Sequence, residues 1–185
     1  MSSNTASDTA NARVRVIVRV RPLRPKEVAQ GVKEIVKAPE NHENDQTLSI
    51  RDPASLLAGV RSELVESWSR DFTFDKCLFS NDPNSFRYAR QEHLFDEVGL
   101  PVLDWCFSGF NCCVFAFGQT GSGKTYSMMG DLNRGAEHYG LVPRICFSMF
   151  DRIDAMASSG AGPSDLSVTF SHMEIYNDSV YDLLA

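Results

Sequence analysis

One stretch, from residue 111 to residue 130, constrains the fold of this 185-residue chain more than any other. It contains six consecutive apolar residues at 112–117, too few to span a membrane, and a glycine follows them directly. A short apolar run with such an end is typical of a strand that is buried on both faces in a parallel sheet. The sequence therefore predicts an α/β fold with a buried parallel strand at this position.

The residues after this run, 118–125, read GQTGSGKT and match G-x-x-x-x-G-K-[ST] at every fixed position. Gly118, Gly121 and Gly123 let a phosphate chain approach the backbone closely. The N–H groups of the loop and the start of the next helix then attract the anion. Lys124 is expected to reach the β- and γ-phosphates, and the Thr125 hydroxyl to ligate Mg²⁺. The alternative is a glycine-rich turn before a surface helix, but the upstream strand favours a nucleoside triphosphate site.

Composition and charge narrow the class of protein. Hydrophobic residues make up 43% and charged residues 23% of the chain, which is ordinary for one globular domain, placed at residues 13–185. No run approaches 18 apolar residues, so neither a transmembrane helix nor membrane contact is expected. Residues 1–12 are small and polar, do not resemble a secretory signal, and are predicted to be a disordered tail. The net charge of −6 argues against a nucleic-acid partner.

The five cysteines are odd in number and form no C-x-x-C pair. This pattern favours a reducing, cytoplasmic compartment, and by spacing it does not favour a metal site. Cys112 and Cys113 are expected to be small core residues that point to opposite faces of the predicted strand.

Residues 13–21 alternate between arginine and valine, with Val14, 16, 18 and 20 on one side. The pattern predicts a strand with one apolar face, ended by Pro22 and Pro25. Arg19, Arg21 and Pro22 then lie at its C-terminal end, where open α/β sheets bind their ligands. An edge strand with solvated arginines explains the pattern equally well.

Other segments have weaker local signals. Short strands are predicted at 32–36, 47–50 and 72–79, a polar turn at 41–46 and a surface insertion at 52–69. Helical spacing is present at 91–108, with an interruption at Pro101. A helix to about Met129, a polar loop at 130–140, a helix at 143–156 and strands between 166 and 184 complete the prediction.

Three separated segments resemble the kinesin motor domain: VRVRPL at 18–23, FAFGQTGSGKTYSMMG at 115–130, and the stretch at 172–184 that contains EIYN. GLVPR at 140–144 is similar to the G-x-I-P-R of that family. The resemblance runs from about Val14 to Leu184. It implies a P-loop NTPase with a central, mainly mixed β-sheet flanked by helices, ATP and Mg²⁺ as ligands, microtubules as the partner, and a place in the cytoplasm on the cytoskeleton.

The resemblance also assigns roles to single residues. It implies that Arg19, Pro22 and Tyr126 line the adenine pocket, which fits the stacking of guanidinium and phenol groups on a purine. With the phosphate loop, the expected nucleotide-binding residues are Gly118, Gln119, Thr120, Gly121, Ser122, Gly123, Lys124, Thr125, Tyr126, Arg19 and Pro22. Phe117 and Asp178 depart from the family pattern, which has tyrosine and glutamate there. Residues 111–115 and 126–130 resemble the kinesin-3 transporters.

Two motifs of the family, N-x-x-S-S-R-S-H and D-x-x-G-x-E, are absent from the 185 residues. In kinesins these motifs sense the γ-phosphate by ordering and releasing loops. The chain is therefore interpreted as the first half of a motor, with no catalytic residue of its own, no motor-like ATP hydrolysis alone, and exposed sheet edges. Cargo and dimer contacts are expected outside this segment. The alternatives are a non-motile nucleotide-binding or scaffold protein, and an unrelated P-loop GTPase or kinase in which the other motifs are coincidence.

Overall fold

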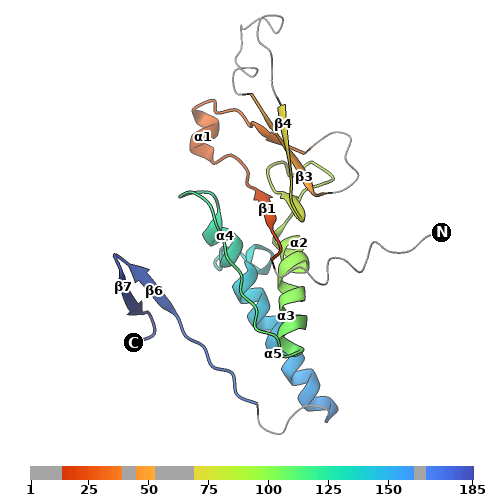
Figure 1. Ribbon diagram of the computed structural model, residues 1–185, viewed down its shortest axis with the longest axis vertical. Helices are drawn as coiled ribbons and strands as arrows, with labels where there is room; N and C mark the ends of the chain where they lie inside the picture. Colours follow the sequence, from red (N-terminus) through yellow and green to blue (C-terminus); the bar gives the residue numbers. More distant parts are fainter. Residues whose placement is uncertain (1–13, 39–44, 53–68, 161–165) are drawn as a thin grey trace, which may run out of the picture. The chain divides into compact units, whose positions relative to one another are not determined.

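The computed structural model describes residues 14–38, 45–52, 69–160 and 166–185 (Figure 1). The chain divides into two compact units, residues 1–145 and 146–185. The predicted disordered tail at 1–12, most of the polar turn at 41–46 and most of the surface insertion at 52–69 lie outside the described residues.

The first unit contains two small sheets (Figure 1). Strand β1 (Ile17–Val20) pairs in parallel with β5 (Lys76–Phe79), with Ile17 opposite Lys76. Strands β2 (Val36–Lys37), β3 (Thr47–Arg51) and β4 (Ser69–Thr73) form an antiparallel sheet in that order. The predicted α/β class and mixed strand directions are present, but the described strands lie in separate sheets instead of one central sheet.

The pair formed by β1 and β5 is covered on both faces, because successive side chains of a strand point in opposite directions. One face contributes to a cluster of Leu48, Cys77 and Phe79, against which Val18 and Val20 pack. The other face contributes to a cluster of Leu78, Ala89, Leu94 and Leu141, against which Ile17 packs. The prediction of a single apolar face is therefore wrong, and Val14 and Val16 lie exposed before the strand.

The predicted single strand at 72–79 is also wrong, since the chain changes sheets within it. Strand β4 ends at Thr73 and β5 begins at Lys76. Between them, the backbone N–H of Asp75 donates to the carbonyl of Val16 at 3.1 Å. The Asp75 carboxylate accepts from the N–H of Val16 at 2.7 Å. Asp75 thus anchors the chain beside the start of β1, at the point where it leaves the antiparallel sheet and enters β5.

The predicted helix at 91–108 consists of α2 (Gln91–Leu94), the π-helix η3 (Phe95–Gly99) and α3 (Leu100–Phe107). Pro101 has no N–H and cannot donate to the carbonyl of Glu97. Arg15 Nη1 donates to that carbonyl instead, at 2.7 Å, and Arg15 Nη2 lies 2.7 Å from Glu97 Oε2. The predicted interruption near Pro101 is confirmed, and it takes the form of a wide turn just before the proline.

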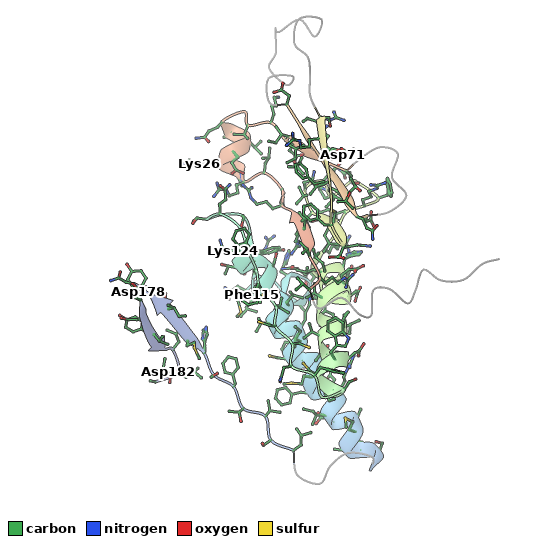
Figure 2. All side chains as sticks on the ribbon, in the orientation of Figure 1. Lys26, Asp71, Phe115, Lys124, Asp178 and Asp182 are labelled. Atoms are coloured by element: carbon green, nitrogen blue, oxygen red, sulfur yellow. The ribbon has the colours of Figure 1, made fainter. Side chains whose placement is uncertain are left out.

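Residues 110–117 do not form the predicted strand. They are extended, and the described part of the chain supplies no neighbouring strand to them. Phe115, labelled in Figure 2, is 88% exposed, and Phe117 is fully exposed. Cys113 is exposed too, although a core position was predicted for it, whereas Cys112 is half-buried. An apolar run predicts burial, but a strand also needs a partner to accept and donate its hydrogen bonds.

The helix after the glycine-rich loop is α4 (Lys124–Met128), which ends within one residue of the predicted Met129. The polar loop at 130–140 contains the short 3₁₀-helix η4 (Ala136–His138). Its two ends are joined by hydrogen bonds from Asp131 N to His138 O and from Gly140 N to Met129 O, both at 3.0 Å. Helix α5 (Leu141–Ser159) extends the helix predicted at 143–156 at both ends.

The second unit ends in a hairpin of β6 (Met173–Tyr176) and β7 (Ser179–Asp182). Its two turn residues, Asn177 and Asp178, have φ angles of 48° and 62°. Such two-residue turns match the twist of a hairpin and favour asparagine and aspartate. The short side chain of Asp178 therefore suits this backbone. The strand predicted at 166–170 is wrong, because these residues are extended, exposed and unpaired within the described chain.

Candidate nucleotide-binding site

The glycine-rich loop at 118–125 has the backbone that its sequence predicts. Gly118, Gly121 and Gly123 have φ angles of 148°, 80° and 100°, in the region that favours glycine. A Cβ atom on Gly118 would lie 2.5 Å from Ser122 Oγ, and one on Gly121 would lie 2.8 Å from Arg24 Nη1. Larger residues at these two positions would therefore displace the side chains of Ser122 and Arg24.

Lys124 folds back over this loop (Figure 2). Its ammonium group donates to the carbonyl of Gly118 at 2.8 Å and to that of Gln119 at 3.1 Å. The N–H of Ser122 donates to the Gln119 carbonyl at 3.1 Å and closes a turn. Thr120 and Thr125 are both exposed. These eight residues thus contain the Lys124 ammonium, several backbone amides and the hydroxyl of Thr125.

Arg19 is held by neutral side chains from three other parts of the chain. Its Nε atom donates to Ser80 Oγ at 3.0 Å, and its Nη1 atom donates to Gln91 Oε1 at 2.7 Å and to Ser127 Oγ at 3.1 Å. Burial lowers the pKa of the guanidinium, because desolvation disfavours its charged form. The alternative of solvated arginines on this strand is therefore wrong for Arg19.

Tyr126 joins Arg19 to the loop that follows α4. The guanidinium carbon of Arg19 lies 5.6 Å from the centre of the Tyr126 ring. The Tyr126 hydroxyl lies 3.2 Å from His138 Nδ1. Since guanidinium and ring contact each other directly, a purine at this place would lie against their outer rim and not between them.

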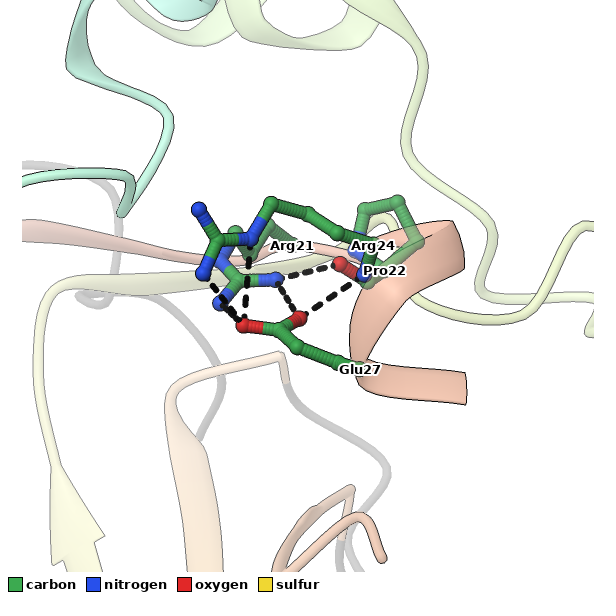
Figure 3. A network of polar contacts seen from close by, with 4 residues as sticks. All are labelled: Arg21, Pro22, Arg24 and Glu27. Atoms are coloured by element: carbon green, nitrogen blue, oxygen red, sulfur yellow. Dashed lines mark hydrogen bonds and ion pairs between the residues drawn. The ribbon is translucent and has the colours of Figure 1, made fainter. Parts of the chain in front are cut away.

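Pro22 is exposed at the end of β1, beside a cluster of charged groups (Figure 3). Its carbonyl accepts from Arg21 Nη1 at 2.8 Å. The Glu27 carboxylate accepts from Arg21 Nη1 and Nη2 and from Arg24 Nη2, each at 2.8 Å. These hydrogen bonds hold the pKa of the Glu27 carboxyl well below its usual range. Glu27 also accepts from the Arg24 N–H at the start of α1 (Pro25–Ala29).

The structure therefore brings the predicted residues into two groups that share α4. The phosphate-loop residues form one group, and Arg19 with Tyr126 forms the other. Sequence reasoning missed the residues that support these groups: Ser80, Gln91 and Ser127 around Arg19, His138 beside Tyr126, and Arg24 and Glu27 beside Pro22. The spacing of Arg24 and Glu27, three residues apart around a helix start, is a usable signal. Gln91 has no such signal, because nothing in its local pattern indicates that it is only 2% exposed.

Within residues 14–38, 45–52, 69–160 and 166–185, no group of three or more His, Cys, Asp or Glu side chains is arranged to hold a metal ion. None of the helices in this part of the chain has the length and apolar character needed to cross a bilayer.

Comparison with known proteins identifies the family. The model of the kinesin motor domain matches residues 19–185. This chain belongs to the kinesin motor domain family. It is 39% identical over 176 residues to "Kinesin-like protein KIF13A" of Homo sapiens. The match covers 95% of this chain and 9% of that protein. It is 37% identical to "Kinesin-related protein 1" of Dictyostelium discoideum, with 92% of this chain and 7% of that protein covered.

Solved kinesin structures share the fold of this kinesin chain. A structure of KIF14 with ADP in complex with a microtubule is 31% identical, with a TM-score of 0.67, and the match covers 94% of this chain and 42% of that one. A two-heads-bound KIF14 dimer with AMP-PNP on a microtubule is 30% identical, with a TM-score of 0.70, and the match covers 95% and 42%. The predicted resemblance and the predicted kinesin-type fold are thus confirmed for the described part of the chain. The chain spans less than half of these structures and a small fraction of the curated relatives.

Proposed function

We propose that residues 118–125 bind the triphosphate of ATP. The observation that carries this proposal is the position of Lys124, whose ammonium lies 2.8 Å from the Gly118 carbonyl, over a loop with little room for side chains. Phosphate oxygens would accept from this cation and from the amides of the loop. The Thr125 hydroxyl, exposed in the first turn of α4, is the proposed ligand of Mg²⁺.

Arg19, Pro22 and Tyr126 are the proposed contacts of the base. The Arg19 guanidinium lies over the Tyr126 ring, so the pair presents a cationic and an aromatic rim that suit the edge of a purine. Pro22, exposed two residues after the last residue of β1, is proposed as a third contact of the base. The intervening Ser127 donates its N–H to the Gly123 carbonyl at 2.9 Å and accepts from Arg19, which couples the base side to the phosphate side.

For the motor to which these residues belong, the proposal is ATP-dependent movement on microtubules in the cytoplasm. Its support is the family itself and the similar kinesins solved on microtubules with ADP or AMP-PNP. Residues 1–185 are proposed to contribute ATP binding to this cycle. Hydrolysis depends on groups that position the attacking water, and the motor is proposed to supply them outside these residues. A non-motile scaffold role is not favoured.

The test is a titration of the protein with a fluorescent ATP analogue, with and without Mg²⁺. We expect a Kd on the order of micromolar, weakened when Mg²⁺ is removed. Lys124→Ala is expected to weaken binding by about 100-fold, because it removes a charge-assisted contact to phosphate. Lys26→Ala is the matched control, since Lys26 is exposed on α1 and is expected to leave the Kd unchanged (Figure 2). A folded sample that binds no analogue, or an unaffected Lys124→Ala variant, contradicts the proposal.

A further inference from the structure

Gln91 is the most completely buried polar side chain beside the candidate base site. It begins α2 and is 2% exposed. A side-chain amide has one acceptor atom and one donor group with two hydrogens, and both ends of Gln91 are used. Its Oε1 atom accepts from Arg19 Nη1 at 2.7 Å. Its Nε2 group donates to the carbonyl of Tyr126 at 2.7 Å and to that of His138 at 3.3 Å.

These three partners belong to different elements of the chain. Arg19 lies on β1, Tyr126 on α4 directly after the phosphate loop, and His138 on η4. Tyr126 and His138 also contact each other through the hydroxyl and the imidazole, at 3.2 Å. Gln91 therefore links the Arg19 guanidinium to the backbone that carries Tyr126, although it is remote from both residues in the sequence.

The orientation of Arg19 depends on this amide. A guanidinium carries its N–H donors in a rigid planar fork, so its acceptors determine its direction. Ser80 is one of these acceptors. Its hydroxyl donates to the Ala89 carbonyl at 2.6 Å, so the lone pairs of its oxygen point away from that carbonyl and can accept from Arg19. Because Ser80, Gln91 and Ser127 are all uncharged, they orient the guanidinium without neutralising it. The positive charge remains available to a ligand that is rich in electrons.

We propose that Gln91 is a positioning residue that holds Arg19 and Tyr126 against the base of the bound nucleotide. It does not touch the nucleotide itself. It sets the affinity for the purine part of ATP separately from the affinity for the polyphosphate part, which is bound by the loop around Lys124. This inference rests on the proposed function, in which Arg19, Pro22 and Tyr126 meet the base.

The experiment compares two ligands on the same protein by isothermal titration calorimetry, ATP and inorganic tripolyphosphate, both with Mg²⁺. Gln91→Met keeps the length of the side chain and removes all three hydrogen bonds. It is expected to weaken ATP binding about tenfold and to change tripolyphosphate binding less than about twofold. Gln91→Glu keeps an acceptor for Arg19, but its negative charge would neutralise the guanidinium and it cannot donate to Tyr126 and His138. A comparable loss of ATP affinity is therefore expected. The ratio of the two Kd values is the decisive quantity, because a general loss of structure would weaken both ligands together.

Gln30→Met is the matched control, since Gln30 is exposed at the end of α1 and neither Kd is expected to change. Thermal melting of each variant reports folding, and Gln91→Glu carries the test if Gln91→Met does not fold. If the wild-type protein binds ATP but the Gln91 variants leave the ratio of Kd values unchanged, the inference is wrong and the proposed function stands. If the wild-type protein binds neither ligand, or Lys124→Ala has no effect, the proposed function itself fails.

Discussion

The two sides of the candidate site are supported in different ways. Arg19 lies on β1, which is paired with β5, and its hydrogen-bond partners are 61, 72 and 108 residues away in the sequence. Lys124 lies after the unpaired segment 110–117, and its two partners are only six and five residues away. The base side is thus organised by tertiary packing, whereas the phosphate side is organised by its own loop. Damage to the core is expected to affect the first side more than the second.

The largest expected effect is that of Leu78→Ala on the paired side. Leu78 is 5% exposed and belongs to the cluster beneath β1. Removing its side chain is expected to reduce the free energy of unfolding by about 2–5 kcal/mol, through lost burial and a residual cavity. Urea denaturation followed by circular dichroism measures this change.

Phe115→Ala is the matched control on the unpaired side, because the Phe115 side chain is 88% exposed. Its expected effect on the free energy of unfolding is within about 0.5 kcal/mol. Equal losses for Leu78→Ala and Phe115→Ala would show that the segment 110–117 is packed in solution, and would remove the contrast between the two sides.

A smaller effect, confined to the phosphate side, is expected for Gly121→Ala. Gly121 has a φ of 80°, and a Cβ there would lie 2.8 Å from Arg24 Nη1. The exposed end of Arg24 can move away, but the added Cβ then lies on the loop proposed to bind phosphate, so the affinity for the fluorescent ATP analogue is expected to fall about tenfold. Gly31→Ala is the control, since Gly31 has a φ of 71° with no atom within 4 Å of its Cβ position. Both variants are expected to lose about 1 kcal/mol of stability, but only Gly121→Ala is expected to lose affinity. Equal affinities for the two variants would contradict the proposed binding of phosphate by residues 118–125.

The smallest effect concerns the end of β1 and depends on pH. Since Arg21 and Arg24 lower the pKa of folded Glu27, ionised Glu27 stabilises the fold above the usual value of 4.5. This stabilisation is progressively lost as the pH falls below about 4.5 towards the lowered pKa. Glu27→Gln is therefore expected to be less stable than the wild type at pH 7, with a difference that narrows in acid. Urea denaturation at several pH values measures this.

Repeating the Glu27 comparison in 1 M NaCl provides its control, because salt screens a partly exposed ion pair and is expected to reduce the difference at pH 7. A difference that widens in acid, or one that salt leaves unchanged, would contradict the assigned role of the Arg21–Glu27–Arg24 contacts.

Local signals in the sequence predict much of the fold. Nearby residues are enough to predict the strand at β1 from its alternation, the strand at β3, and the end of α4. The failures occur where pairing depends on distant residues. The run at 112–117 predicts burial without naming a partner, and the segment 72–79 does not reveal that Asp75 moves the chain to another sheet. Strand pairing is a long-range property, so a short window cannot supply it.

The candidate site divides in the same way. The phosphate loop is predictable because its glycines and Lys124 act within eight consecutive residues. The surroundings of Arg19 are not, because Ser80, Gln91 and Ser127 come from separate parts of the chain. The burial of a glutamine at a helix start cannot be predicted from its neighbours, because most polar residues at such positions are exposed.

The π-helix η3 has a consequence for the alignment of side chains along the helix that contains it. Successive residues of an α-helix are rotated by about 100°. Over a regular helix, Gln91 and Leu103 would point about 120° apart, whereas the extra residue absorbed by a π-turn brings them to within about 20°. Both side chains are almost fully buried. The wide turn at Phe95–Gly99 thus changes the direction of the residues that follow it, so that a buried polar side chain and a buried apolar side chain of one helix point in nearly the same direction.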